Sequence, residues 1–130
     1  SAMERGVYFQ SANDIMVIAQ IEGTEAVKNL DDILEVQGID ILFIGPYDLS
    51  QSLGVPGQTT HPCVIEEMNK IVSAAKKKGV VIGTFTDSRE TMEMWMKAGV
   101  QYISYSVDMG IFYDSCKRLT EQFQEIEAVL

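Results

Sequence analysis

The stretch IDILFIGPYDLS, residues 39–50, joins an apolar run to a polar turn and decides the fold. Its first six residues have the length of a strand and are almost continuously apolar. That pattern is typical of a parallel sheet that is covered on both faces or closed into a barrel. Gly45 and Pro46 follow at once and predict a tight turn. We expect the backbone amides of Tyr47 and Asp48, exposed in that turn, to be able to bind an anion.

Three more apolar runs of strand length occur along the chain, at residues 16–21, 80–85 and 102–107. Helical patterns separate or follow them, and we predict helices over residues 24–35, with a break near 29–31, and over 62–78, 88–98 and 111–130. Helix signals support these bounds: Pro62 suits a first helical position, Gly79 and Gly99 suit helix ends, and residues 87–90 resemble a capping box. The β-α order repeats four times, which predicts an α/β fold of right-handed βαβ units. Residues 1–13 are expected to end a preceding helix and to turn into the first strand.

Composition limits the possible partners. The chain has 130 residues, with 10 Lys and Arg against 19 Asp and Glu, so the net charge of −9 argues against nucleic acid and anionic membrane surfaces. Hydrophobic residues make up 46% of the chain, enough for a globular core rather than a disordered segment. No apolar run approaches the roughly 18 residues of a membrane span. Cys63 and Cys116 lie far apart without metal or disulfide spacing, so we expect a reducing, cytoplasmic location.

Two carboxylates, Glu22 and Asp48, follow successive predicted strands and are the strongest candidates for chemistry. Adjacent parallel strands lie about 4.8 Å apart, so side chains at their carboxyl ends can meet at one point. Two carboxylates held together favour a cation between them, and an all-oxygen site without Cys or His prefers Mg²⁺ or Mn²⁺. The alternative, favoured slightly by spacing alone, is that Glu22 caps the following helix and Asp48 caps the turn.

Other candidates favour structural roles. His61, the single histidine, precedes the helix at residue 62 and is better explained by capping or packing than by catalysis. Asp87 is most simply a helix cap, and Asp108 also stands before a predicted helix. The Met- and Trp-rich residues 92–96 fit a core or a subunit interface. The long polar loop over residues 51–61 is of a kind that is often functional. The sequence has no dinucleotide, P-loop or nucleophile-elbow motif.

Several ordered motifs resemble the HpcH/HpaI aldolase family over about residues 8–108. They are QIE (20–22), NLDDIL (29–34), GID (38–40), FIGPYDLS (43–50), SLG (52–54) and HP (61–62). Members are metal-dependent 2-oxo acid aldolases on a (β/α)8 TIM barrel. By this resemblance, residues 4–130 are expected to be the C-terminal half of such a barrel, about strands five to eight. Residues 1–3 look like an expression remnant.

The resemblance also implies a site. Glu22 and Asp48 would be the metal ligands, for Mg²⁺, Mn²⁺ or Co²⁺, and Gln20 would hydrogen-bond in the pyruvate pocket. The turn that begins at Gly45 and Pro46 would present the amides of Tyr47 and Asp48 to the pyruvate carboxylate, and Phe85 would wall the aldehyde side. The implied reaction is the reversible cleavage of a 4-hydroxy-2-oxo acid to pyruvate and an aldehyde, in which the metal stabilises the enolate. The partners are therefore expected to be small 2-oxo acids and further copies of the chain.

Two departures from the family limit this transfer. Ser106 stands where many members have glycine before Val-Asp. The family's arginine and its base-assisting histidine lie in the first half of the barrel, so no catalytic residue is assigned here, and neither Arg89 nor His61 takes those roles. Two alternatives follow. One is a catalytically incomplete half-barrel that binds metal and 2-oxo acid and self-associates. The other is a lyase or transferase of the wider superfamily that acts on an acyl thioester.

Overall fold

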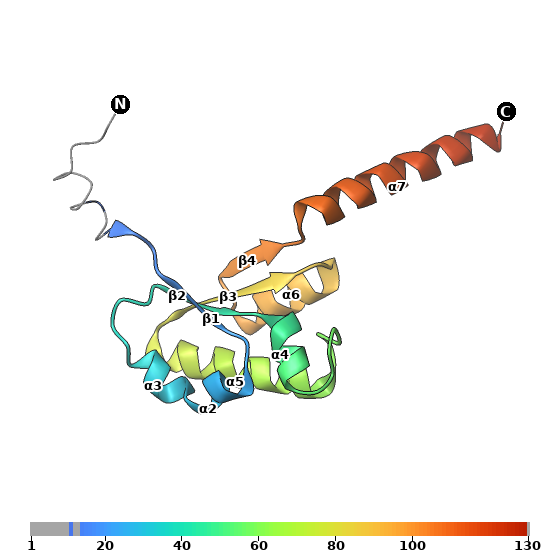
Figure 1. Ribbon diagram of the computed structural model, residues 1–130. Coiled ribbons are helices and arrows are strands. Elements are labelled where there is room, and N and C mark those ends of the chain that lie inside the picture. Colours follow the sequence, from blue (N-terminus) through green and yellow to red (C-terminus); the bar gives the residue numbers. More distant parts are fainter. Residues whose placement is uncertain (1–10, 12–13, 130) are drawn as a thin grey trace.

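A parallel four-stranded sheet forms the centre of the chain in the computed structural model, which describes residues 11 and 14–129 (Figure 1). The strands are β1 (Ile18–Ile21), β2 (Ile41–Ile44), β3 (Val81–Thr86) and β4 (Tyr102–Tyr105), and they lie side by side in chain order. All three neighbouring pairs are parallel. The predicted α/β fold with four strands in sequence is therefore confirmed, whereas the expectation for residues 1–13 lies outside the described residues apart from Ser11.

The helices α2 (Thr24–Lys28), α3 (Leu30–Leu34) and α5 (Pro62–Lys78) lie on one face of the sheet (Figure 1). The short helix α4 (Pro46–Ser52) follows β2, and α6 (Arg89–Ala98) connects β3 to β4. The last helix, α7 (Asp108–Glu127), projects away from the sheet (Figure 1). None of the helices in the described part of the chain has the length and apolar character to cross a membrane.

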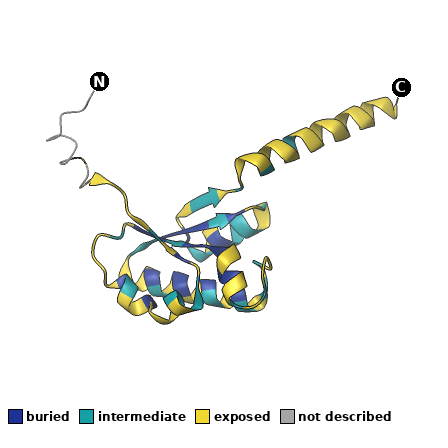
Figure 2. Cartoon of the chain, viewed as in Figure 1, coloured by how far each residue is buried: buried dark blue, intermediate teal, exposed yellow. Residues whose placement is uncertain are grey.

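The core lies between the sheet and α5. Leu42, Ile44 and Ile82 of the strands are fully buried, as are Met68 and Ile71 of the helix. Alternate strand residues point to opposite faces, so this layer is built by one side chain in two from each strand. Figure 2 shows that the buried residues lie along the strands and on the helices that cover the sheet.

Local signals place most helix ends correctly. His61 caps α5 through its side chain, which accepts a hydrogen bond from the Cys63 amide, and Gly79 ends that helix in the left-handed conformation. The break near residue 29 separates α2 from α3 at Asn29. The cap of α6 is Ser88, whose hydroxyl accepts from the Thr91 amide, so the interpretation of Asp87 as a helix cap is wrong.

Other predicted bounds shift by a few residues. β1 begins at Ile18 instead of residue 16, and β4 ends at Tyr105 instead of residue 107. α7 begins at Asp108, so Asp108 is inside the helix and does not precede it. The expected tight turn after β2 is the first turn of α4, because Pro46 occupies a position at the helix start where its missing amide hydrogen costs nothing.

The opposite face of the sheet is open. Phe43 of β2 and Tyr102 of β4 meet there edge to face, with ring centroids 6.1 Å apart, although β3 lies between their strands. The intervening residue in register with both is Gly83, which has no side chain to separate the rings. Tyr102 remains 41% exposed, so aromatic rings on this face are only partly covered. Of the two arrangements expected for such strands, a sheet covered on both faces does not hold within the described chain, which leaves the alternative of a sheet closed into a barrel.

We expect Gly83→Ala to destabilise the fold. The new methyl group would lie 2.8 Å from a Phe43 ring carbon, 2.9 Å from a Tyr102 ring carbon and 3.2 Å from the Tyr102 carbonyl oxygen. Forcing these groups apart is expected to lower the free energy of unfolding by about 1–3 kcal/mol, measured by urea denaturation. Gly23→Ala is the matched control, because the nearest atom to its methyl group would be 3.9 Å away. Equal stability of the two variants would contradict this account of the open face.

Candidate active site

The register of the sheet brings the candidate residues to one edge. Ile21 at the end of β1 pairs with Ile44 at the end of β2, and Phe85 of β3 pairs with Ser104 of β4. The Gly45 amide donates a 3.0 Å hydrogen bond to the Ile21 carbonyl oxygen and extends the β1–β2 pairing by one step. Residues that follow parallel strands therefore gather at a single edge, which is where α/β proteins bind ligands.

Gly45 is held under the side chains of Gln20 and Glu22. The Gln20 side-chain amide donates a hydrogen bond to Glu22 Oε2. A Cβ atom at Gly45 would lie 2.9 Å from Gln20 Nε2 and 3.3 Å from Glu22 Oε2. Its φ angle of −88° is accessible to any residue, so space and not backbone conformation requires glycine here. The Gly in the GPYDLS motif thus lets Gln20 and Glu22 lie over the end of β2.

The capping alternative for Glu22 is wrong. Gly23 is the N-cap of α2, and the Thr24 amide in the first turn of that helix donates a 2.9 Å hydrogen bond to Ser52 Oγ. The Glu22 side chain instead accepts a hydrogen bond from Gln20. Asp48 lies in the first turn of α4, which lacks a side-chain cap. A carboxylate in a first turn is favoured by the helix dipole, and the amides of Tyr47 and Asp48 have no acceptor within the helix.

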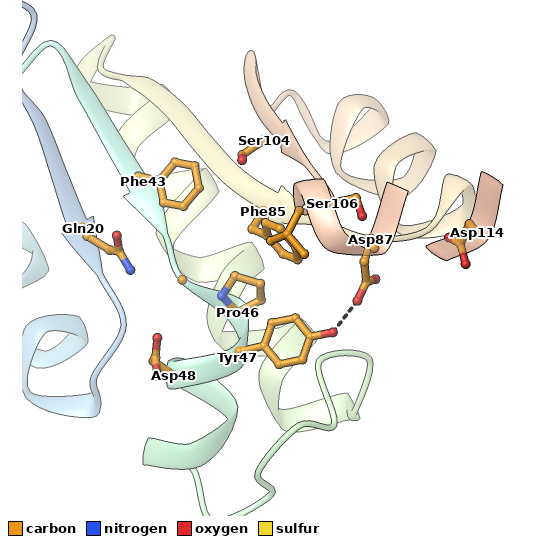
Figure 3. Close-up of a pocket in the computed structure, with 13 residues that line it drawn as sticks. Gln20, Phe43, Pro46, Tyr47, Asp48, Phe85, Asp87, Ser104, Ser106 and Asp114 are labelled. Carbon is orange, nitrogen blue, oxygen red and sulfur yellow. Dashed lines mark hydrogen bonds between the residues drawn. The ribbon is translucent and has the colours of Figure 1, made fainter. Parts of the chain in front are cut away.

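A cavity of about 790 Å³ opens beside these residues (Figure 3). Its apolar wall is made by Phe43, Pro46, Phe85 and Val107. Its polar side chains are Gln20, Asp48, Asp87, Ser104, Ser106 and Asp114, and Tyr47 and two glycines complete the lining. The predicted residues Gln20, Gly45, Pro46, Tyr47, Asp48 and Phe85 all line this cavity. Glu22 is not among the lining residues, but its carboxylate accepts a hydrogen bond from Gln20, which lines the cavity.

Tyr47 and Asp87 form a pair that was not predicted. The Tyr47 hydroxyl donates a hydrogen bond to Asp87 Oδ2 (Figure 3). The Tyr47 ring packs edge to face against the Phe85 ring, with the ring centroids 5.9 Å apart. The hydrogen bond to Asp87 is the main cause that raises the pKa of Tyr47, and burial and the Asp87 charge add to it. The sequence offered one signal for a role of Asp87 in the site, its position directly after the third strand. That position fits a helix cap equally well.

Ser106 holds a backbone conformation that glycine adopts more readily. Its φ angle is 56°, in the left-handed region, and its amide donates a 2.8 Å hydrogen bond to the Thr86 carbonyl oxygen. Ser106 also packs closely on α7, since a Cβ atom at Gly110 would lie 2.9 Å from Ser106 Oγ. Ser106 therefore holds a left-handed backbone conformation and adds a hydroxyl group to the cavity lining.

Protein ligands for a metal are few in the described residues. No group of three or more His, Cys, Asp and Glu side chains there is arranged to hold a metal ion. The single histidine is engaged at the start of α5, where its Nδ1 lies 3.0 Å from the Cys63 sulfur. A metal at this edge of the sheet would therefore take at most two carboxylates from the described chain and fill its other positions with water or substrate.

We expect Asp87→Asn to lower the pKa of Tyr47 toward its ordinary value of about 10, because the carboxylate that accepts the phenolic hydrogen is lost. The tyrosine ring signals in a ¹³C NMR pH titration measure this, and Tyr47→Phe identifies the signal. Asp32→Asn, on the exposed surface of α3, controls for the change in net charge. A Tyr47 pKa that is the same in Asp87→Asn and in the unmodified chain would show that the pair does not exist in solution.

The sequence model of the HpcH/HpaI aldolase/citrate lyase family matches residues 2–115. The chain is 33% identical over 117 residues to 4-hydroxy-2-oxo-heptane-1,7-dioate aldolase of Escherichia coli. The matched region covers 89% of this chain and 45% of that enzyme. It is 30% identical over 119 residues to 5-keto-4-deoxy-D-glucarate aldolase of Citrobacter koseri. That match covers 91% of this chain and 46% of the Citrobacter enzyme.

Comparison with solved structures points to the same family. An HpcH/HpaI aldolase/citrate lyase family protein of Burkholderia cenocepacia superposes with a TM-score of 0.87 at 31% identity, over 93% of this chain and 48% of that one. The chain thus spans about half the length of the relatives that it matches. The family match covers nearly all of the sequence and includes every motif of the candidate site. This chain belongs to the HpcH/HpaI aldolase/citrate lyase family.

Proposed function

We propose that this chain provides the metal- and 2-oxo-acid-binding half of a divalent-metal aldolase, corresponding to about strands five to eight of a (β/α)8 barrel. The whole enzyme would cleave 4-hydroxy-2-oxo acids reversibly to pyruvate and an aldehyde. The observation that carries the proposal is the packing of Gln20 and Glu22 over Gly45, beside a cavity that Asp48 also lines. The two similar aldolases, whose names describe oxo acids with two carboxylates, support the reaction class.

The side chains present fit a hard divalent cation. Glu22 and Asp48 offer carboxylate oxygens, and both residues are exposed at the edge of the sheet, where water can reach them. Mg²⁺ and Mn²⁺ favour oxygen ligands, and Mg²⁺ commonly keeps several waters while binding one or two carboxylates. When bound, such an ion would supply Lewis-acid polarisation of the 2-oxo group.

The chain's own groups would hold and orient the substrate. The amides at the start of α4 would donate to the substrate carboxylate, and the Gln20 side chain would hydrogen-bond next to Glu22. Phe85 would wall the far side, where the aldehyde forms. Cleavage breaks the bond between C3 and C4, leaves its electron pair on the pyruvate portion and removes the proton of the C4 hydroxyl group. The resemblance assigns that proton transfer and an arginine contact to the first half of the barrel.

A second candidate function is a half-barrel that binds metal and 2-oxo acid without turnover and associates with another copy. The open face of the sheet favours it, as does α7, where Phe112 and Phe123 are 72% and 70% exposed. Release of pyruvate from a 4-hydroxy-2-oxo acid by this chain would exclude the candidate, and so would a monomer of 14.5 kDa in sedimentation.

We expect Glu22→Gln and Asp48→Asn to weaken metal-dependent pyruvate binding by at least about tenfold, because each removes one of two carboxylates proposed to hold the ion. Isothermal titration of pyruvate in the presence of Mg²⁺ or Mn²⁺ measures the effect. The matched control is Glu66→Gln on α5, away from the site. The Glu66 carboxylate oxygen lies 3.0 Å from Lys70 Nζ. Pyruvate binding that survives both substitutions, or that is equal in EDTA, would contradict the metal assignment.

A further inference from the structure

The cavity has two chemically different sides. Gln20 and Asp48, next to the proposed metal, lie on one side, and Asp87 and Asp114 lie on the other (Figure 3). The Tyr47 ring reaches from the first side to the second, where its hydroxyl meets Asp87 (Figure 3). If the 2-oxo acid portion of the substrate occupies the first side, its aldehyde portion extends toward Asp87.

The second side carries negative charge without a compensating cation. No Lys, Arg or His side chain is among the described residues that line the cavity. Within residues 11 and 14–129, the side-chain hydrogen-bond partner of Asp87 is the uncharged phenol of Tyr47. A substrate carboxylate placed here would therefore face like charge, and no cationic group of the described lining would pair with it.

The same side is well suited to accept hydrogen bonds. The Tyr47 hydrogen is committed to Asp87, which leaves the phenolic oxygen and the second Asp87 oxygen as acceptors. The contact between Tyr47 and Phe85 restricts the ring that positions this hydroxyl. Ser104 and Ser106 add hydroxyl groups to the lining of the cavity.

We propose that the Tyr47–Asp87 pair determines specificity for the aldehyde portion, favouring an uncharged, hydroxyl-bearing end over one that ends in a carboxylate. This inference rests on the proposed function. Such a preference would differ from the names of the two similar aldolases, which describe dicarboxylates. Asp87 would act by accepting a hydrogen bond from the substrate and by repelling an anion, and Tyr47 would position it.

Two ligands that differ only at the far end test the proposal: 7-hydroxy-2-oxoheptanoate and 2-oxoheptanedioate. Neither has a C4 hydroxyl group, so neither can be cleaved. With Mg²⁺ present, isothermal titration of the chain should show the hydroxyl ligand binding about tenfold or more tightly than the dicarboxylate. The comparison needs no variant, so it does not depend on the folding of a mutant.

Variants then assign the effect. Asp87→Asn should bring the two affinities within about threefold of each other, since the repulsion by Asp87 is removed and only the charge of Asp114 remains on that side. Tyr47→Phe should weaken the hydroxyl ligand several-fold and leave the dicarboxylate disfavoured. Asp32→Asn, an equal change of charge on the surface of α3, should leave the ratio unchanged.

The outcomes are distinguishable from failure of the proposed function. Equal or tighter binding of the dicarboxylate, while pyruvate still binds with Mg²⁺, would overturn this inference alone. An affinity ratio that Asp87→Asn does not change would also overturn it. Absence of binding by all three ligands, pyruvate included, would overturn the proposed function together with this inference.

Discussion

The hydrogen bond from the Gly45 amide to the Ile21 carbonyl oxygen joins the last residue of β1 to the first residue after β2. It aligns the ends of the two strands that carry the candidate ligands. The absence of a side chain at Gly45 then allows Gln20 and Glu22 to lie over that junction. A residue with a Cβ atom there would have to displace the Gln20 amide or the Glu22 carboxylate, so strand pairing and site geometry depend on the same position.

One face of the sheet contributes the buried core, and the opposite face lines the candidate site. One face is covered by α2, α3 and α5 and supplies the buried core, including Leu42, Ile44 and Met68. The other carries Phe43, Phe85 and Ser104, which line the cavity. Gly83 lets aromatic rings from strands two positions apart meet on this open face. The face that binds ligand in our proposal is thus the face that contributes least to the core.

Sequence predicted the fold well where the signals are local. The helix at Pro62–Lys78 is confirmed at both ends, because Pro62 at its start and Gly79 at its end act within one turn. The helix α4 was missed because seven residues are too few for a clear apolar period, and Pro46 is as typical of a turn as of a helix start. The strands were predicted in the right order, with ends shifted by at most two residues.

The site was predictable only in part. Glu22 and Asp48, which follow the ends of two successive strands, could be found from the rule that parallel strands gather their carboxyl ends, whereas Gln20 was assigned only through the family resemblance. The Tyr47–Asp87 contact joins residues 40 positions apart, across α4 and the end of β3, and no local pattern distinguishes it from a cap at Asp87. Ser88, one residue further on, takes the cap and leaves Asp87 available to the cavity.

Paramagnetic broadening by Mn²⁺ tests the central claim most directly, that Glu22 and Asp48 together form a cation site at the edge of the sheet. At Mn²⁺ concentrations below that of the protein, the backbone amide signals of Glu22, Gly23, Tyr47 and Asp48 should broaden first. Those of the exposed carboxylate pair Asp31 and Asp32 on α3 should stay sharp. Broadening that begins at Asp31 and Asp32 while Glu22 and Asp48 remain sharp would contradict the account.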